Sequence, residues 1–237
     1  LTVTDIAALN ETQVAALSAT QAAAPSATQV AGLSTTSLSA LDATQVAALT
    51  TTQAKALTAT QVAALNATDI AEFTTAQLGA LTTTQVAALS ATNVTARADT
   101  QIQALSTTQL ARLGTGAVAA FDGTQVAALS TTQVRALTAT QVGALDTTDV
   151  AEFTDTQIAA LTAAQVQAWS TTVISDLAGT KIAALDVTQI PSLTVTQLDY
   201  LSTTNIAAFN TTQLYAFTST QIASLDAGQI EAYLGAV

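Results

Sequence analysis

The chain is built from one eight-residue unit that repeats without interruption. Read from Thr2, the sequence divides into 29 consecutive octads that end at Tyr233, with no insertion and no deletion. A typical octad is residues 58–65, which read Thr-Ala-Thr-Gln-Val-Ala-Ala-Leu. A phase held this strictly restricts the chain to folds in which every eighth residue has equivalent surroundings.

Five of the eight positions are strongly selective. Position one is Ser, Thr, Asn or Asp in 26 octads, position three is Thr in 25, and position four is Gln in 20. Position five is Val, Ile or Leu in 27 octads. Position eight is Leu in 20 octads and also holds all five Phe and the single Trp169. Two large apolar residues per octad, at fixed places, indicate a packed core and not a disordered tract.

The period of eight argues against the two simplest repeat folds. In one continuous α-helix, eight residues overshoot two turns by about 80°, so the apolar stripe would wind around the helix and bury nothing consistently. A β-solenoid requires alternation with a period of two, which the Val-Ala-Ala-Leu segment lacks. The β-solenoid nevertheless remains the main alternative.

The pattern fits a helix start in every octad. A Ser, Thr, Asn or Asp followed three residues later by Gln or Asp is a capping box, and the flanking Leu and Val are spaced as a hydrophobic staple. A new start every eight residues limits each helix to one or two turns, which are unstable alone and need packed neighbours. We therefore predict an all-α fold, a tight solenoid of very short helices with Val and Leu inward and Thr and Gln outward or capping.

The domain organisation follows from the same pattern. We expect residues 1–237 to form a single repeat array, with octads over 2–233, and to be a piece of a longer chain. Residues that depart from the consensus recur every ten octads, so residues 42–121 and 122–201 form a longer super-repeat. Duplication or superhelical geometry could each produce it. Lys55 precedes Glu72 by the interval that separates Arg135 from Glu152, and we expect these charges to face each other from octads two apart.

Composition excludes several classes of function. The chain has no Cys, no His and no Met, so disulfides, thiolate or imidazole catalysis and His/Cys metal sites are impossible. Its net charge of −11 disfavours binding to nucleic acid or anionic membranes. No apolar run approaches the 18–20 residues of a membrane span, so we expect no membrane insertion.

Octads such as residues 58–65 and 82–89 resemble the octapeptide-repeat regions of very large bacterial surface or secreted proteins, often described as adhesin-like. The resemblance covers the whole chain but brings no catalytic residue with it. It implies an extracellular or cell-surface segment, acidic and cysteine-free, that serves as a spacer or display surface. Its partners would be neighbouring domains of a larger chain, and surface polysaccharide or protein.

Candidate sites are weak. The densest acidic cluster could hold calcium, which prefers several oxygen ligands; its members are Asp146, Asp149, Glu152 and Asp155. The same acids are also well placed simply as helix caps. Tyr200 and Tyr215 lie outside the two apolar positions and are candidates for exposed contacts.

The expected function is therefore structural. We expect a spacer or display segment without catalysis and without a cofactor, because groups of unlike, convergent residues are missing. The alternative is a direct binding module for polysaccharide, calcium or ice that uses a regular surface of Thr, Gln and Asp.

Overall fold

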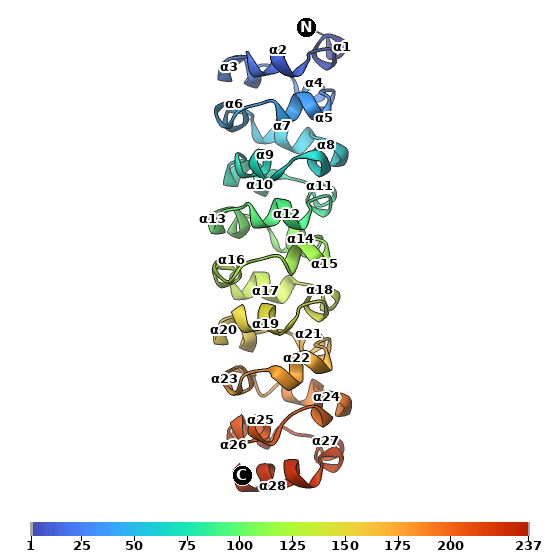
Figure 1. Ribbon diagram of the computed structural model, residues 1–237, viewed down its shortest axis with the longest axis vertical. Helices are drawn as coiled ribbons and strands as arrows, with labels where there is room; N and C mark the ends of the chain where they lie inside the picture. The colour runs from blue at the N-terminus through green and yellow to red at the C-terminus, as the bar shows by residue number, and fades with distance from the viewer. Residues whose placement is uncertain (1, 237) are drawn as a thin grey trace. The chain divides into compact units, whose positions relative to one another are not determined.

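The protein is an all-helical solenoid, as the octad pattern predicts. The computed structural model describes residues 2–236, and in that range short helices are joined by tight turns, with no β-strand (Figure 1). The β-solenoid alternative is therefore wrong. Each octad supplies one helix, and the helices divide between two compact units, one ending at Phe121 and the other beginning at Asp122. This boundary also separates the two copies of the super-repeat.

The helices of the first unit are mostly four to six residues long. They are α1 (Val3–Ala7), α2 (Glu11–Ala15), α3 (Ala19–Ala23), α4 (Ala27–Ala31), α5 (Thr35–Ser39), α6 (Ala43–Ala48), α7 (Thr51–Ala56), α8 (Ala59–Ala64), α9 (Ala67–Ala71), α10 (Thr75–Ala80), α11 (Thr83–Ala87), α12 (Ala91–Thr95), α13 (Asp99–Gln103), α14 (Thr107–Leu110) and α15 (Thr115–Val118).

The second unit contains helices of the same kind, one 3-10 helix, and a longer final helix. They are α16 (Gly123–Ala128), α17 (Thr131–Ala136), α18 (Ala139–Gly143), α19 (Thr147–Glu152), α20 (Asp155–Ala160), α21 (Ala163–Gln167), α22 (Thr171–Asp176), α23 (Gly179–Ala183), η1 (Ile190–Ser192), α24 (Val195–Asp199), α25 (Thr203–Ala208), α26 (Thr211–Leu214), α27 (Ser219–Ser224) and α28 (Ala227–Ala236).

The capping box starts nearly every helix. At α8 the Thr58 hydroxyl accepts from the backbone N–H of Gln61 at 3.1 Å, and the Gln61 side-chain oxygen accepts from the Thr58 N–H at 2.8 Å. Two of the helix's otherwise unpaired donors are thereby satisfied within four residues. Among the exceptions, Ala98, Gly114 and Ala178 occupy N-cap positions and make no side-chain cap bond.

Several helices end where position eight adopts an extended backbone. Leu65 has φ −63° and ψ 135°, and its N–H donates to the Val62 carbonyl before the next cap begins at Asn66. The chain reverses through such extended pairs without a left-handed residue anywhere in the described range. This explains why only nine glycines serve 29 octads.

The two apolar positions form the core. Val62 is fully buried and Leu65 is 5% exposed, and every Phe and Trp169 is buried at position eight. The predicted inward placement of positions five and eight is confirmed. The interior is thus lined by the position-five and position-eight side chains of successive octads, nearly all of them aliphatic or aromatic.

Helices three octads apart stack on one another within each unit. Among the packed pairs are α3 with α6, α4 with α7, and α18 with α21, and Figure 1 shows α3 directly above α6. Side-chain hydrogen bonds between adjacent superhelical turns join residues 28 positions apart, as from Gln77 to the carbonyl of Leu49. One superhelical turn therefore takes between three and four octads. The expectation that octads two apart are the facing neighbours is wrong.

Pro191 changes one octad. It lacks the N–H that position six donates in an α-helix, so residues 190–192 form the 3-10 helix η1 in place of an α-helix. The Gln189 side chain still caps Asp186 and still bonds to the previous turn, so the stacking continues through this octad.

Candidate functional site

The most regular chemical feature of the molecule is a ladder of buried glutamines at position four. In Gln77, which is 2% exposed, the side-chain oxygen accepts from the Thr74 N–H. Its Nε2 donates to the carbonyl oxygens of Val46 and Leu49 in the preceding turn, both at 2.7 Å. One amide thus caps its own helix and fastens that helix to the turn before it. Of the two predicted roles for glutamine, capping a helix start is confirmed, whereas outward placement is wrong for buried glutamines such as Gln77.

The same bond recurs in both units with the same register. Gln85 donates to the Leu57 carbonyl and Gln165 to the Leu137 carbonyl, each 28 residues earlier and each at 2.7 Å. Since buried polar groups are costly unless paired, this register satisfies the amide and also the carbonyls left over at the helix end. Within each unit the ladder holds one turn to the next through a bond that recurs in most octads.

Substitutes at position four keep the bond whenever they carry a donor. The Ser37 hydroxyl donates to the Leu9 carbonyl at 2.8 Å, and Asn93 Nδ2 donates to the Leu65 carbonyl at 2.8 Å. Lys181 Nζ donates to the Phe153 carbonyl and also forms an ion pair with Asp155 at 3.3 Å. The acceptor always lies 28 residues earlier, so the register belongs to the fold and not to the glutamine side chain.

A signal for this second role was present in the sequence. Position four is Gln in 20 octads and Glu in none, although either residue can close a capping box. A carboxylate only accepts, whereas an amide also donates. The exclusion of Glu therefore indicates a second partner that needs a donor.

A pair of acidic clusters marks the super-repeat. Burial raises the pKa of Glu72, and the nearby carboxylates of Asp69 and Asp42 raise it further. Burial likewise raises the pKa of Glu152, and the nearby carboxylates of Asp149 and Asp122 raise it further. Each glutamate has one oxygen, Oε2, that is buried and makes no hydrogen bond. The two units thus contain the same local arrangement.

The proposed opposite-charge pairs do not form. Glu72 faces carboxylates across the turn, and within residues 2–236 the ion pair found is the one between Lys181 and Asp155. The interval of 17 residues between Lys55 and Glu72 is about two octads, whereas the stacked elements lie three to four octads apart. The prediction is wrong because it assumed too short a turn.

The four acidic residues of the calcium hypothesis make different interactions in the structure. Asp146 caps α19 by accepting from the Asp149 N–H at 2.9 Å, and Asp149 accepts in return from the Asp146 N–H. Glu152 lies at the end of the same helix, but Asp155 lies in α20 and pairs with Lys181. Across the described residues no group of three or more acidic side chains is arranged to hold a metal ion. The calcium hypothesis gains no support from this geometry.

Other predicted surface groups lie where the sequence placed them. Tyr200 and Tyr215 are 54% and 69% exposed. Position three is exposed in every octad, from Thr4 through Thr220 to Gly228. The regular outer surface therefore presents the Thr of position three, whereas the position-four glutamines from Gln45 onward are buried and do not contribute to the surface of the binding alternative. No helix of the described range is long and apolar enough to span a membrane.

A guanidinium group also lies in the core. Arg97 takes position eight, where it is 4% exposed, and this burial lowers its pKa to about 10. The long aliphatic part of its side chain replaces a leucine among the apolar residues.

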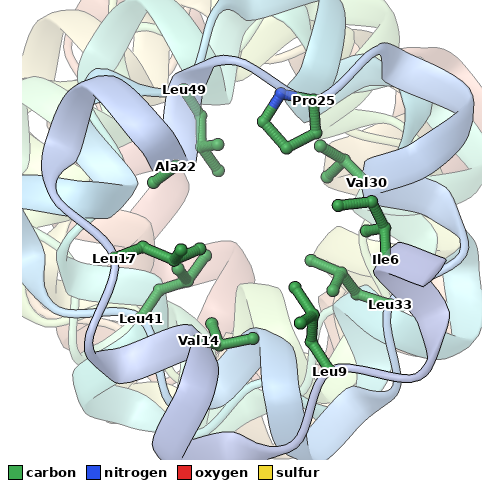
Figure 2. Close-up of a pocket in the computed structure, with 10 residues that line it drawn as sticks. All are labelled: Ile6, Leu9, Val14, Leu17, Ala22, Pro25, Val30, Leu33, Leu41 and Leu49. Carbon is green, nitrogen blue, oxygen red and sulfur yellow. The ribbon is translucent and has the colours of Figure 1, made fainter. Parts of the chain in front are cut away.

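The first turn leaves the interior of the solenoid open. Figure 2 shows a ring of apolar side chains that point toward a common centre, among them Ile6, Leu9, Leu17 and Pro25. A hollow of about 380 Å³ adjoins this ring and has Gln21 and Gln29 at its rim. None of the acidic residues lines it.

Comparison with known proteins finds a repeat family that matches two stretches of the chain. Residues 62–96 and 118–155 match the ALTTAQ repeat family. No curated protein matches the chain. The match supports a repeat-containing structural protein, in agreement with the helical octads. The first matched stretch includes the ladder residues Gln77 and Gln85, and the second includes Glu152.

Proposed function

We propose that this chain is a structural spacer or display segment of a bacterial cell-surface or secreted protein, adhesin-like in its setting, and that it performs no catalysis. The observation that carries the proposal is the invariant register of the glutamine ladder. Because successive turns within each unit are fastened by bonds of the same 28-residue register, octads can be added or removed without creating a new kind of contact.

The surface chemistry supports the same role. The outward position three is Thr in 25 octads, and the net charge is −11. Such a surface is well hydrated and presents many equivalent weak contacts in place of one strong site, which suits multivalent display. Neighbouring domains of a larger chain are the natural partners of a spacer.

The proposal is tested by changing the number of octads. We would compare the chain with a variant in which residues 42–121 are duplicated and one in which they are deleted, and measure the maximum dimension by small-angle X-ray scattering. A spacer changes its maximum dimension by equal steps for equal changes in octad number. Growth with roughly the 0.38 power of chain length, as in compact domains, would overturn the proposal.

A second pair of deletions tests whether the eight-residue register matters apart from the length of the chain. Deletion of residues 58–65 removes one whole octad and should leave helicity per residue and cooperative unfolding intact. Deletion of residues 58–61 removes half an octad, so the local capping boxes and the 28-residue register are lost around the junction. Equal tolerance of both deletions would show that the register is not what holds the turns together.

A further inference from the structure

One side of the second unit carries no acidic residue. Four segments on this side are stacked on successive turns by ladder bonds, which run from Gln165 to Leu137, from Gln189 to Leu161 and from Gln221 to Leu193. The segments joined in this way are residues 131–139, 159–167, 187–195 and 215–223. None of them contains Asp or Glu, and all ten acidic residues of the second unit lie outside them. We call the exposed side chains of these four segments the carboxylate-free face.

Apolar side chains reach solvent on this face. Val187, Val195 and Tyr215 are 37%, 43% and 69% exposed, and Pro191 is exposed between the two valines. Figure 1 shows α21, α24 and α27, which belong to these segments, above one another on one side of the second unit. Covering such groups with a partner is favourable, because apolar surface removed from water contributes about 25 cal/mol per Å².

The charge distribution indicates which partner can cover the face. The chain has a net charge of −11, so two copies repel each other wherever their carboxylates meet. The four segments contain one charged residue, Arg135. Asp186 borders the face beside Val187, and its carboxylate accepts from the N–H and the hydroxyl of Thr188 at 2.9 and 2.6 Å. A second copy therefore meets apolar groups and a cation on this side of the unit, in place of a row of carboxylates.

The two ends of the face complement each other. Arg135 lies in the first of the four segments and Tyr215 in the last, and both are exposed. The 80 residues between them are half an octad short of three 28-residue intervals, so both lie on this side, three turns apart. In a parallel pair of copies, Arg135 would face Arg135 and the like charges would repel. In an antiparallel pair each guanidinium meets the Tyr215 ring of the other copy, and a cation within about 6 Å of such a ring is attracted to it.

We propose that two copies of this chain pair side by side and antiparallel through the carboxylate-free face of the second unit. Val187 and Val195 of each copy pack against residues 159–167 of the other, where the exposed alanines Ala163 and Ala164 permit close approach. The same surface is used by both copies, so the contact closes as a dimer and recruits no third copy. The pairing goes beyond the spacer role and does not rest on it.

Sedimentation equilibrium of the full chain tests the pairing in about 0.15 M salt, where the Debye length is about 8 Å. The weight-average mass should rise with concentration from 23.8 kDa toward twice that value and no further. A mass that stays at the monomer value up to about 1 mM chain overturns the proposal, and so does a mass that passes the dimer. Retention of a monomeric chain on immobilised dextran, lost in Tyr215→Glu, would assign the face to a neutral polysaccharide and also overturn it.

Two tyrosines supply a matched pair of variants. Tyr215→Glu removes the ring and adds a carboxylate to the face, so it should raise the dissociation constant of the dimer at least about tenfold. Tyr200→Glu makes the same change beside Asp199 at a side chain that is 54% exposed, 15 residues or about half a turn away, and should leave that constant unchanged. Unchanged helicity and melting temperature identify both variants as folded. Equal weakening by the two variants would overturn the assignment to this face.

The absence of cysteine allows engineered thiols to report the orientation. Thr132 and Thr220 are exposed in the first and last segments, and changing them leaves Arg135 and Tyr215 in place. In the antiparallel pair these two threonines lie opposite each other. A mixture of the single variants Thr132→Cys and Thr220→Cys should therefore be joined by a short bis-maleimide, and neither variant should be joined to itself. Cross-linking of Thr132→Cys with itself would reveal a parallel pair and overturn the proposal.

Discussion

The side-chain amide of Gln77 donates to the backbone carbonyl of Leu49, 28 residues earlier, at 2.7 Å. Its own carbonyl oxygen simultaneously accepts from the N–H of Thr74, three residues earlier. A single side chain therefore couples the start of a helix to the end of another helix one superhelical turn away. Local structure and tertiary structure are fixed by the same group.

The first prediction tests the two halves of that amide. Gln77→Glu keeps an acceptor for the cap but turns a carboxylate oxygen toward the Val46 and Leu49 carbonyls in a buried site. An uncompensated buried charge of this kind costs about 3–5 kcal/mol in unfolding free energy. Gln13→Glu makes the same change in the first turn, where the side chain is exposed, and should cost about 0.5 kcal/mol or less. Urea denaturation measures both, and equal effects would remove the tertiary role of the amide.

The second prediction concerns the caps. Thr138→Ala removes the hydroxyl that accepts from the Gln141 N–H at 3.1 Å and should cost about 0.5–2 kcal/mol, as should Ser130→Ala. Asp146→Ala should cost less, because it also relieves repulsion of Glu152. Ala98 is an N-cap without a side-chain bond, so Ala98→Ser should raise stability by a similar amount. If chemical denaturation shows the same free energy of unfolding for all these variants and the unmodified chain, the capping bonds do not contribute to stability.

The third prediction follows from the acidic clusters. The pKa values of Glu72 and Glu152 are raised in the folded protein, chiefly by burial. Folding therefore favours the protonated glutamates, so their contribution is most favourable below pH of about 4.5 and is lost as pH rises through the folded pKa. The double variant Glu72→Gln with Glu152→Gln should melt at a higher temperature than the unmodified chain at pH 7, and this advantage should shrink as the pH is lowered toward 4.5.

The control for that experiment is Glu231→Gln, which removes the same charge from an exposed position in α28. It should leave the melting temperature nearly unchanged at pH 7. For a chain of this size 1 kcal/mol corresponds to about 2–4 °C, which calorimetry resolves. A pH-independent difference between the double variant and the unmodified chain would contradict the assignment to these carboxyl groups.

The fourth prediction compares two glycines. A Cβ at Gly143 would lie 2.8 Å from the Ala168 backbone oxygen in the next turn, whereas a Cβ at Gly116 meets nothing within 4 Å. Gly143→Ala should therefore destabilise the protein by about 1–3 kcal/mol through overpacking. Gly116→Ala should stabilise it by up to about 1 kcal/mol through helix propensity. Thermal unfolding of the two variants should shift in opposite directions, and shifts of the same sign would show that the turns do not approach as closely as described.

The sequence by itself determined the local structure. Each capping box involves residues three apart and each staple residues five apart, so the starts, ends and inward faces of the helices could be predicted from one octad such as residues 58–65. The same local reasoning placed Trp169 in the core and the Thr of position three on the surface. It also correctly favoured helices over strands.

Only the tertiary structure decided which residues of neighbouring superhelical turns contact one another. The length of a superhelical turn is the sum of many small angles at extended residues such as Leu65, and no single octad specifies that sum. The turn of three to four octads placed Glu72 beside Asp42 and away from Lys55, and it placed the amide of Gln77 against Leu49. Contacts 28 residues apart depend on that accumulated geometry, which is why the sequence predicted the helices but not the ladder that joins them.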